Sequence, residues 1–152
     1  MAEIIVSIAD VPGVGRPHFV ATPDDQLGTF FIVRIKREPN IGGLEIPPSS
    51  RTSPGGREWV VAFSNACTHM GCDLISTKQS VDLQGTYLAG PCPCHMTTFD
   101  LSRAGMTVMG PATEALPQLG LQWVSAEQTM VRVAGWLQDR DVPYGLPYGR
   151  TA

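Results

Sequence analysis

All four cysteines of the 152-residue chain, and two of its three histidines, lie between residues 65 and 100. They form two short motifs, C-T-H-M-G-C at residues 67–72 and P-C-P-C-H at residues 91–95. Each motif offers one Cys–His pair, spaced Cys-x-His in the first and Cys-x-x-His in the second. Thiolates and imidazoles are the donors that bind transition metals. This stretch therefore predicts a metal site that the rest of the chain must position.

Zinc and a two-iron cluster are the main alternatives for this site. A Cys2His2 set satisfies tetrahedral zinc, but zinc sites usually pair like ligands, as Cys-x2–4-Cys and His-x3–5-His. Here each motif offers one ligand of each kind, which suits a two-iron cluster whose irons each take one type of ligand. Buried structural thiols beside unrelated histidines would need two scarce residue types to converge by chance.

The two motifs resemble the cluster-binding loops of Rieske iron–sulfur proteins, C-T-H-x-G-C and C-P-C-H-x-[ST]-x-[FY]-D. The resemblance implies a Rieske-type 2Fe-2S cluster as the cofactor. Cys67 and Cys92 would hold one iron, and His69 and His95 would hold the other. We expect the two histidines at the tip of the domain, flanked by Met70, Met96 and residues 110–112, an apolar collar that either shields the cluster from water or meets another redox protein.

The second cysteine pair carries a further implication of the resemblance, a disulfide between Cys72 and Cys94 that ties the two loops together. Rieske ferredoxins and oxygenase domains generally lack this pair, so the chain resembles the disulfide-bearing, high-potential branch. Because disulfides persist in oxidising compartments, we expect a periplasmic or other extracytoplasmic location. The apolar run at residues 4–6 is too short for a signal peptide or a transmembrane segment. Export would therefore depend on a leader that is not present in this sequence or on a partner that is exported with the chain, and the alternative is that the protein stays inside.

A narrower resemblance, over roughly Glu58 to Arg150, is to the small Rieske subunit of arsenite oxidase. The residues that carry it are Met70, Phe99-Asp100, Gly105-Met106, residues 110–118 (G-P-A-T-E-A-L-P-Q) and Tyr148-Gly149-Arg150. Other molybdenum oxidoreductases, such as iodate reductase, have related halves. The resemblance implies a large molybdopterin-containing catalytic subunit as partner, and a cytochrome c or cupredoxin-type protein as electron acceptor.

The implied activity is one-electron transfer. Replacing thiolates by neutral imidazoles removes negative charge and favours electron uptake, so Rieske centres have potentials of about −150 to +300 mV. The motifs leave no open coordination position, so we expect the chain to transform no substrate itself. It would be the electron-transfer subunit of an arsenite oxidase-type enzyme. A free-standing soluble Rieske carrier, or the ectodomain of a cytochrome bc-type Rieske subunit, is the alternative.

Two residues of the second loop are expected to tune the cluster. In quinol-oxidising relatives a Ser and a Tyr donate hydrogen bonds to the cluster sulfurs and raise the potential. The matching residues here are Thr97, which keeps a hydroxyl, and Phe99, which has none. We therefore expect a potential below that of the quinol-oxidising type. Asp100 and Glu114 are interpreted as solvated loop carboxylates rather than as an acid–base pair.

The whole chain predicts a single all-β domain over residues 1–152, the Rieske fold of antiparallel sheets with a small cluster-binding subdomain at about residues 65–112. The length suffices for one core, and thirteen prolines, sixteen glycines and no helical periodicity favour short strands and turns. The expected strands are residues 4–6, 29–36 and 58–64, with hairpins at 81–89 and at 119–124 with 130–134. A net charge of −3 gives no support for nucleic-acid binding.

Two segments are expected to lack regular structure. Residues 38–57 contain clusters of proline and glycine and predict a long loop, either a solvated insertion or a partner contact. Residues 138–152 predict an extended C-terminal tail that lies across this domain or a partner. His18, outside both motifs, is expected at the surface or in a satisfied polar contact.

Overall fold

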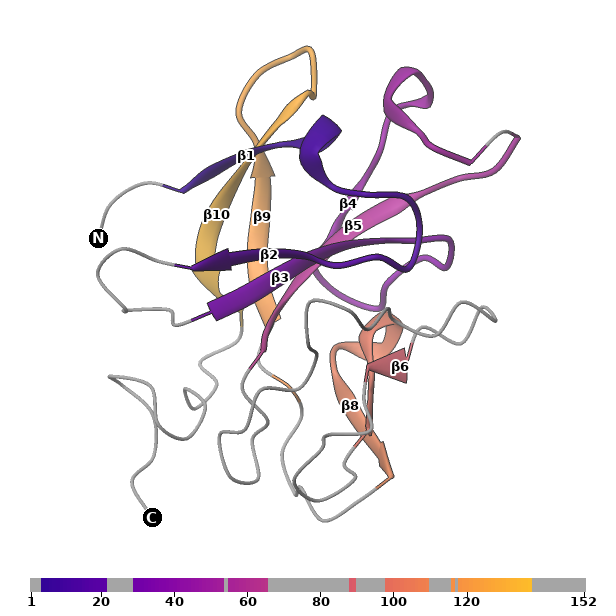
Figure 1. Ribbon diagram of the computed structural model, residues 1–152, viewed down its shortest axis with the longest axis vertical. Coiled ribbons are helices and arrows are strands. Elements are labelled where there is room, and N and C mark those ends of the chain that lie inside the picture. Colours follow the sequence, from indigo (N-terminus) through magenta and orange to yellow (C-terminus); the bar gives the residue numbers. More distant parts are fainter. Residues whose placement is uncertain are drawn as a thin grey trace.

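The computed structural model describes residues 4–21, 29–53, 55–65, 88–89, 98–109, 116 and 118–137. These residues form two antiparallel sheets, with the smaller sheet beneath the larger one in Figure 1. The strands are β1 (Ile5–Ser7), β2 (His18–Ala21), β3 (Thr29–Ile35), β4 (Leu44–Glu45), β5 (Trp59–Ser64), β6 (Leu88–Ala89), β7 (Thr98–Asp100), β8 (Met106–Met109), β9 (Gln118–Trp123) and β10 (Met130–Trp136). The larger sheet has the order β1-β10-β9-β5-β3-β2, with β4 also paired to β5, and the smaller sheet has the order β6-β7-β8.

The prediction of an all-β protein is confirmed. The helical elements of the described residues are three 3-10 turns, η1 (Ile8–Asp10), η2 (Pro48–Ser50) and η3 (Leu101–Arg103). In this part of the chain no helix is long and apolar enough to cross a membrane. The expected strands at residues 4–6, 29–36 and 58–64 correspond to β1, β3 and β5, and the expected closing hairpin corresponds to β9 and β10. Of the expected hairpin at residues 81–89, only β6 is described, and it pairs with β7.

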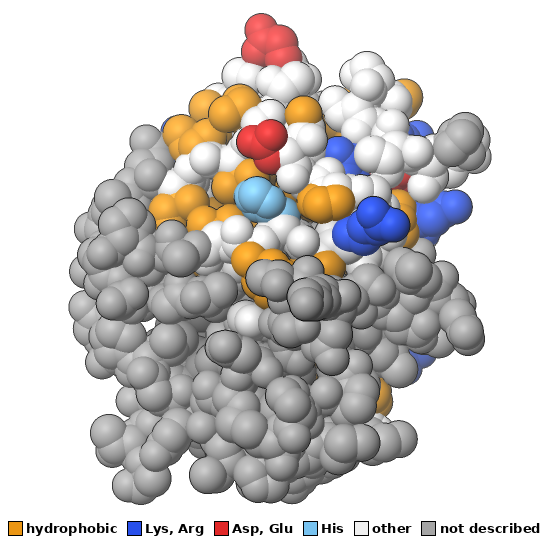
Figure 2. All heavy atoms as spheres, viewed as in Figure 1, with side chains coloured by type: hydrophobic (Ala, Val, Ile, Leu, Met, Phe, Trp, Pro, Cys, Tyr) orange, Lys and Arg blue, Asp and Glu red, His pale blue; other side chains and the backbone are white. Residues whose placement is uncertain are grey.

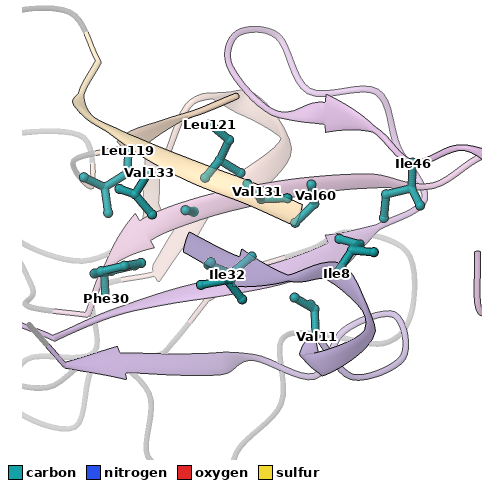
Figure 3. Packing of buried hydrophobic residues seen from close by; sticks show 12 residues of the cluster. Ile8, Val11, Phe30, Ile32, Ile46, Val60, Leu119, Leu121, Val131 and Val133 are labelled. Atoms are coloured by element: carbon teal, nitrogen blue, oxygen red, sulfur yellow. The ribbon is translucent and has the colours of Figure 1, made fainter. Parts of the chain in front are cut away.

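Strands β3 and β5 are buried on both faces, and this creates two hydrophobic cores. Successive side chains of a strand point to opposite faces, and in both strands nearly every one is apolar. One core, on the side where the larger sheet curls over itself, contains Phe30, Ile32, Val60, Ala62, Leu119, Leu121, Val131 and Val133, closed by Val6, Ile8, Val11 and Ile46 (Figure 3). The other core contains Phe31, Val33, Ile35, Trp59, Val61 and Phe63, together with Phe99, Leu101 and Leu116. The second core therefore joins the smaller sheet to the larger one.

The expectation of an unstructured loop at residues 38–57 is wrong. Within it, β4 pairs with β5, and Ile46 is completely buried in the first core. The backbone N–H of Ile46 also donates to the Glu58 carbonyl, at 2.8 Å. The prolines and glycines mark real turns, but one isolated apolar residue gives no periodic signal by which a packed segment could be recognised in the sequence.

A buried ion pair closes the end of the larger sheet where β5 begins. Arg34 and Glu58 lie 3.1 Å apart, with 2% and 0% of their side chains exposed. Arg34 also donates to the carbonyl oxygens of Ile8 and Ser50, both at 2.7 Å, and of Val11, at 3.1 Å. One guanidinium thus holds η1, η2 and β3 together, because its several donors reach carbonyls of both turns at once.

Glu58 completes this network from the acceptor side. Its carboxylate accepts from the backbone N–H of Thr52, at 3.0 Å, and from that of Ser53. Burial alone would raise the pKa of Glu58, but the N–H groups of Ser53 and Thr52, together with Arg34, favour the charged form and lower that pKa below its ordinary value. The carboxylate therefore stays ionised in the folded protein at neutral pH.

The outer surface is less uniform than the cores. Figure 2 shows hydrophobic side chains gathered over the larger sheet, with Lys and Arg side chains together toward one edge of the visible face. His18 is half-buried in β2, where it pairs with Ile32. Among the described residues, Met106 and Val108 of β8 are large hydrophobic side chains that are 44% and 45% exposed.

Candidate metal centre

The predicted ligands lie outside the described residues, as do most of the residues expected around them. They are Cys67, His69, Cys92 and His95, the expected disulfide partners Cys72 and Cys94, and Thr97, Met70, Met96, Glu114 and residues 110–112 and 138–152. Of the predicted site residues, the structure describes Phe99 and Asp100. The site is therefore described through the strands that carry the two motifs.

The strands at the base of each motif are well defined. β5 ends at Ser64, shortly before the first motif begins. β6 ends at Ala89 before the second motif, and β7 begins at Thr98 after it. Because Ala89 pairs with Phe99 in antiparallel register, the segment that contains the second motif is closed at its base by two hydrogen-bonded strands.

One hydrophobic cluster anchors the bases of both motif segments. Phe63, next to the end of β5, and Phe99, in β7, are both completely buried in the second core. Phe63 also packs on Phe31, with ring centroids 6.3 Å apart. Burying each phenylalanine side chain stabilises the fold by roughly 1.5–3 kcal/mol. The motif segments therefore start from one rigid apolar base, although they are separated in sequence.

Gly105 brings three segments into close contact at this base. Its N–H donates to the Asp100 carbonyl at 2.9 Å, and its carbonyl accepts from the Leu116 N–H at 2.8 Å. Its φ of +74° lies in the left-handed region, and an added Cβ would lie 2.5 Å from the Leu116 oxygen and 3.0 Å from Cε1 of Phe63. Only glycine fits without strain or displacement. The sequence resemblance includes Gly105 but indicates no role for it.

The interpretation of Asp100 as a solvated loop carboxylate is wrong. Asp100 is 5% exposed, and its Oδ1 accepts from the N–H of Ser102 at 3.0 Å and from Ser102 Oγ at 2.8 Å. Asp100 is the N-cap of η3, a position that aspartate, asparagine and serine favour because their oxygens satisfy free N–H groups. The run Asp100-Leu101-Ser102 carries the signal of such an Asx turn, so the sequence could have revealed it.

Residues 37–43 brace the smaller sheet against the larger one. The Asn40 N–H donates to the Ser102 carbonyl at 3.0 Å, and Arg37 Nη1 donates to Ser102 Oγ at 3.3 Å. On the other side, Nε2 of the buried Gln118 donates to the Ile41 carbonyl at 3.0 Å. Ser102 belongs to η3 and Gln118 to β9, so these bonds fix the base of the second motif to the main sheet.

Phe99, the predicted tuning residue, lies in an apolar environment. It is completely buried in the cluster that contains Phe63, Leu101 and Leu116. A tyrosine in this position would bring a hydroxyl that needs a partner when buried. The expectation that Phe99 donates no hydrogen bond follows from its chemistry, whereas its effect on a potential stays a prediction.

The described part of the chain also contains a cavity of about 530 Å³. It is lined by residues 7–9 and 11–13, by Arg34, by residues 49–52 and by Thr129. Arg34, at its wall, already uses its guanidinium for the hydrogen bonds described above. The cavity lies at the end of the larger sheet where β5 begins, whereas the first motif follows the end of β5, so it is not part of the candidate metal centre.

The donor set of the two motifs fits an iron–sulfur cluster, and the described residues offer no alternative metal site. Within the described residues, no three His, Cys, Asp or Glu side chains form a group that could hold a metal ion. The predicted donors, two thiolates and two imidazoles, are those of a Rieske centre. Both motif segments leave from strands whose side chains share one core, and this arrangement is compatible with joint binding of one cluster.

Comparison with known proteins identifies the domain. Residues 48–120 match the model of the Rieske [2Fe-2S] domain. The chain is 53% identical over 68 residues, 41% of its length, to iodate reductase subunit IdrB from Denitromonas iodatirespirans. It is 40% identical over 80 residues, 50% of its length, to the cytochrome bc1 complex Rieske iron–sulfur subunit from Streptomyces lividans. It spans only 32% and 44% of these two relatives.

The fold has a counterpart among solved structures. The soluble domain of Rieske protein II (soxF) from Sulfolobus acidocaldarius matches 90% of this chain and 72% of its own, with a TM-score of 0.56 and 23% identity. This likeness supports the fold alone. Rieske domains bind a [2Fe-2S] cluster that transfers single electrons. The chain therefore carries a Rieske [2Fe-2S] domain.

Proposed function

We propose that this chain is the small electron-transfer subunit of an arsenite oxidase-type molybdenum oxidoreductase. The observation that carries the proposal is the similarity to iodate reductase subunits, 53% and 48% identical over 68 residues. The bc1 Rieske subunits of two Streptomyces species are less similar, with 40% identity over a longer stretch of 80 residues. A large molybdopterin-containing subunit would be the permanent partner, and a cytochrome c or cupredoxin-type protein would be the electron acceptor.

In this proposal Cys67 and Cys92 ligate one iron, and His69 and His95 ligate the other. When bound, the cluster supplies a one-electron couple of relatively high potential, because two of its ligands are neutral. The chain's own contribution is to hold the two motif segments on one base, through Phe63 and the strand pair that Phe99 closes. That base is dry, which limits the access of water to the site from the side of the core.

A disulfide between Cys72 and Cys94 and an extracytoplasmic location belong to the same proposal. Each cysteine lies within one of the two motifs, so the bridge would link the two motif segments to each other. Disulfides persist in oxidising compartments. Mass spectrometry of the native protein under non-reducing conditions should find these two thiols bonded, and two free thiols would contradict the bridge.

A second candidate function is that of a cytochrome bc-type Rieske subunit. It is favoured by 40% identity over 80 residues to the Streptomyces lividans subunit and by 36% over 87 residues to the ubiquinol-cytochrome c reductase subunit of Blastochloris viridis. The partner distinguishes the two functions, because one partner contains molybdenum and the other contains haem. A free-standing carrier would have neither.

The test is purification of the tagged chain from its native host. We expect a large subunit and molybdenum to co-purify with it in a one-to-one ratio, measured by mass spectrometry and elemental analysis. Haem-containing partners without molybdenum would support the bc-type function instead. The chain purified alone, in good yield and with its cluster, would contradict both subunit functions.

Ligation is tested separately. Cys67→Ser and His95→Ala should each abolish the Rieske EPR spectrum of the reduced protein, because each removes one of the four protein ligands. His18→Ala is the matched control, since His18 is half-buried in β2, outside both motifs. It should keep the wild-type spectrum. An intact spectrum in either ligand variant would refute the ligand assignment.

A further inference from the structure

Asp100 places a buried negative charge at the base of the second motif segment. It ends β7, and its register partner is Leu88 of β6. These two strands close the segment that contains Cys92 and His95. Asp100 lies five positions after His95, and an extended chain covers at most about 3.6 Å per residue. The Asp100 backbone therefore lies within about 18 Å of the backbone of His95.

The turn that Asp100 caps does not need this charge. Its Oδ1 accepts from the N–H and the hydroxyl of Ser102, which are both neutral donors. Asparagine or serine would offer the same acceptor to an N-cap, without the cost of burying a charge. A neutral side chain would therefore suffice for the cap, and the negative charge of Asp100 needs a separate explanation.

The charge of Asp100 is only weakly compensated by its neighbours. Among the described residues, the cation paired with Asp100 is Arg103, whose Nε lies 3.7 Å from Oδ2, beyond normal hydrogen-bond length, and whose side chain is 56% exposed. Solvent and salt screen such an exposed cation much more than they screen a buried carboxylate. The second cation, Arg37, donates to Ser102 Oγ rather than to the carboxylate. The field of Asp100 therefore extends into the surrounding protein.

We propose that Asp100 is an electrostatic tuning residue that lowers the reduction potential of the cluster. The inference rests on the ligand assignment under the proposed function. Reduction adds one negative charge to the cluster, and a buried carboxylate nearby repels it through a medium of low dielectric constant. Asp100 thus favours the oxidised state, while Arg103 opposes it weakly.

The test compares three variants by protein-film voltammetry at pH 7 and constant salt. Asp100→Asn keeps the shape and the capping oxygen but removes the charge, so the potential should rise. We expect at least a threefold change in the oxidised-to-reduced ratio at fixed potential, which is about 28 mV for a one-electron couple. Arg103→Gln should shift the potential the other way, and by less, because Arg103 is exposed.

Ser102→Ala is the matched structural control. It removes a hydrogen bond to Asp100 without changing any charge. If Asp100 acts only as a cap, Ser102→Ala should lower the urea midpoint, whereas Asp100→Asn, which keeps the capping oxygen, should leave both the midpoint and the potential unchanged. If its charge acts on the cluster, only Asp100→Asn should move the potential beyond the error.

Each outcome decides the matter. An unchanged potential in folded, cluster-loaded Asp100→Asn would overturn the proposal. If that variant fails to hold its cluster, the exposed charge reversal Arg103→Glu replaces it and must lower the potential, so an unchanged value would overturn the proposal equally. Absence of the Rieske spectrum from the wild-type protein would instead refute the proposed function, and the two failures are therefore distinguishable.

Discussion

The two ends of β5 are stabilised in opposite ways. Where the strand begins, Glu58 and Arg34 form a buried ion pair whose remaining donors and acceptors are bonded to backbone groups of η1, η2 and the segment after it. Where the strand ends, Phe63 packs on Phe99, and Gly105 allows a backbone contact with no room for a methyl group. One end depends on charge and hydrogen bonds, and the other depends on close packing.

This difference separates the stability of the scaffold from the properties of the candidate metal centre. The ion pair lies at the end remote from both motif segments, so its loss should weaken the fold and leave a bound cluster unchanged. The packed end carries both segments, so small changes of shape there should reach the cluster. Variants at the two ends can therefore break or sharpen the comparison.

The largest expected effect is that of Glu58→Gln. It leaves Arg34 charged, buried and without its carboxylate, and breaking a buried pair in this way costs about 3–5 kcal/mol. The free energy of unfolding, measured by urea titration, should fall by about that amount. The EPR spectrum and potential of the remaining folded protein should match the wild type. A shifted potential would show that the two ends are coupled.

The pH dependence of the wild-type protein provides the control. Because folding lowers the pKa of Glu58 below its ordinary value, the protonated form is disfavoured in the folded state. Its contribution to stability is complete above that value and is lost as the pH falls through the lowered pKa. Stability should thus decline more steeply with acid in the wild type than in Glu58→Gln. Parallel acid profiles would contradict the role of this carboxylate.

A smaller loss of stability, but a change at the cluster, is expected for Gly105→Ala. Alanine at positive φ costs about 1–2 kcal/mol, and crowding against Leu116 and Phe63 adds about 1–3 kcal/mol. The neighbours must move, so the EPR line shape or the retention of the cluster should change. Gly55→Ala is the matched control, because Gly55 has a φ of +73° and nothing within 4 Å of an added Cβ. If both variants leave the spectrum unchanged, the packed end does not control the cluster.

The smallest effect is expected for Phe99→Tyr. A tyrosine hydroxyl that donates to a cluster sulfur should raise the potential, and one hydrogen bond of about 0.5–1.5 kcal/mol corresponds to about 20–65 mV for one electron. Phe19→Tyr makes the same chemical change in a partly buried residue that packs on the same core but comes from β2. It should leave the potential unchanged. A lowered or unchanged reduction potential for Phe99→Tyr would exclude the tuning role of residue 99.

Features that occupy a continuous stretch of sequence are the ones that can be predicted best. The apolar runs of β3 and β5 stand out because both faces of these strands are buried, and the spacing of cysteine and histidine in the two motifs indicates the cofactor. The smaller sheet is not predicted, because β7 and β8 are too short to show a period. The burial of Ile46 is not predicted for a related reason, because it depends on β5, a distant partner that local sequence does not reveal.

The position of β5 also sets an order of events during folding. Its neighbours β3 and β9 come from opposite sides of the sequence, and β9 pairs with it across the entire stretch that contains both motifs. Pairing between such distant strands is slow, because long loops must close before any contact forms. Phe99 joins a core that β3 and β5 form, so we expect it to dock after these two strands have paired. The four proposed donors would therefore meet late, and cluster insertion would act on a chain whose main sheet is already built.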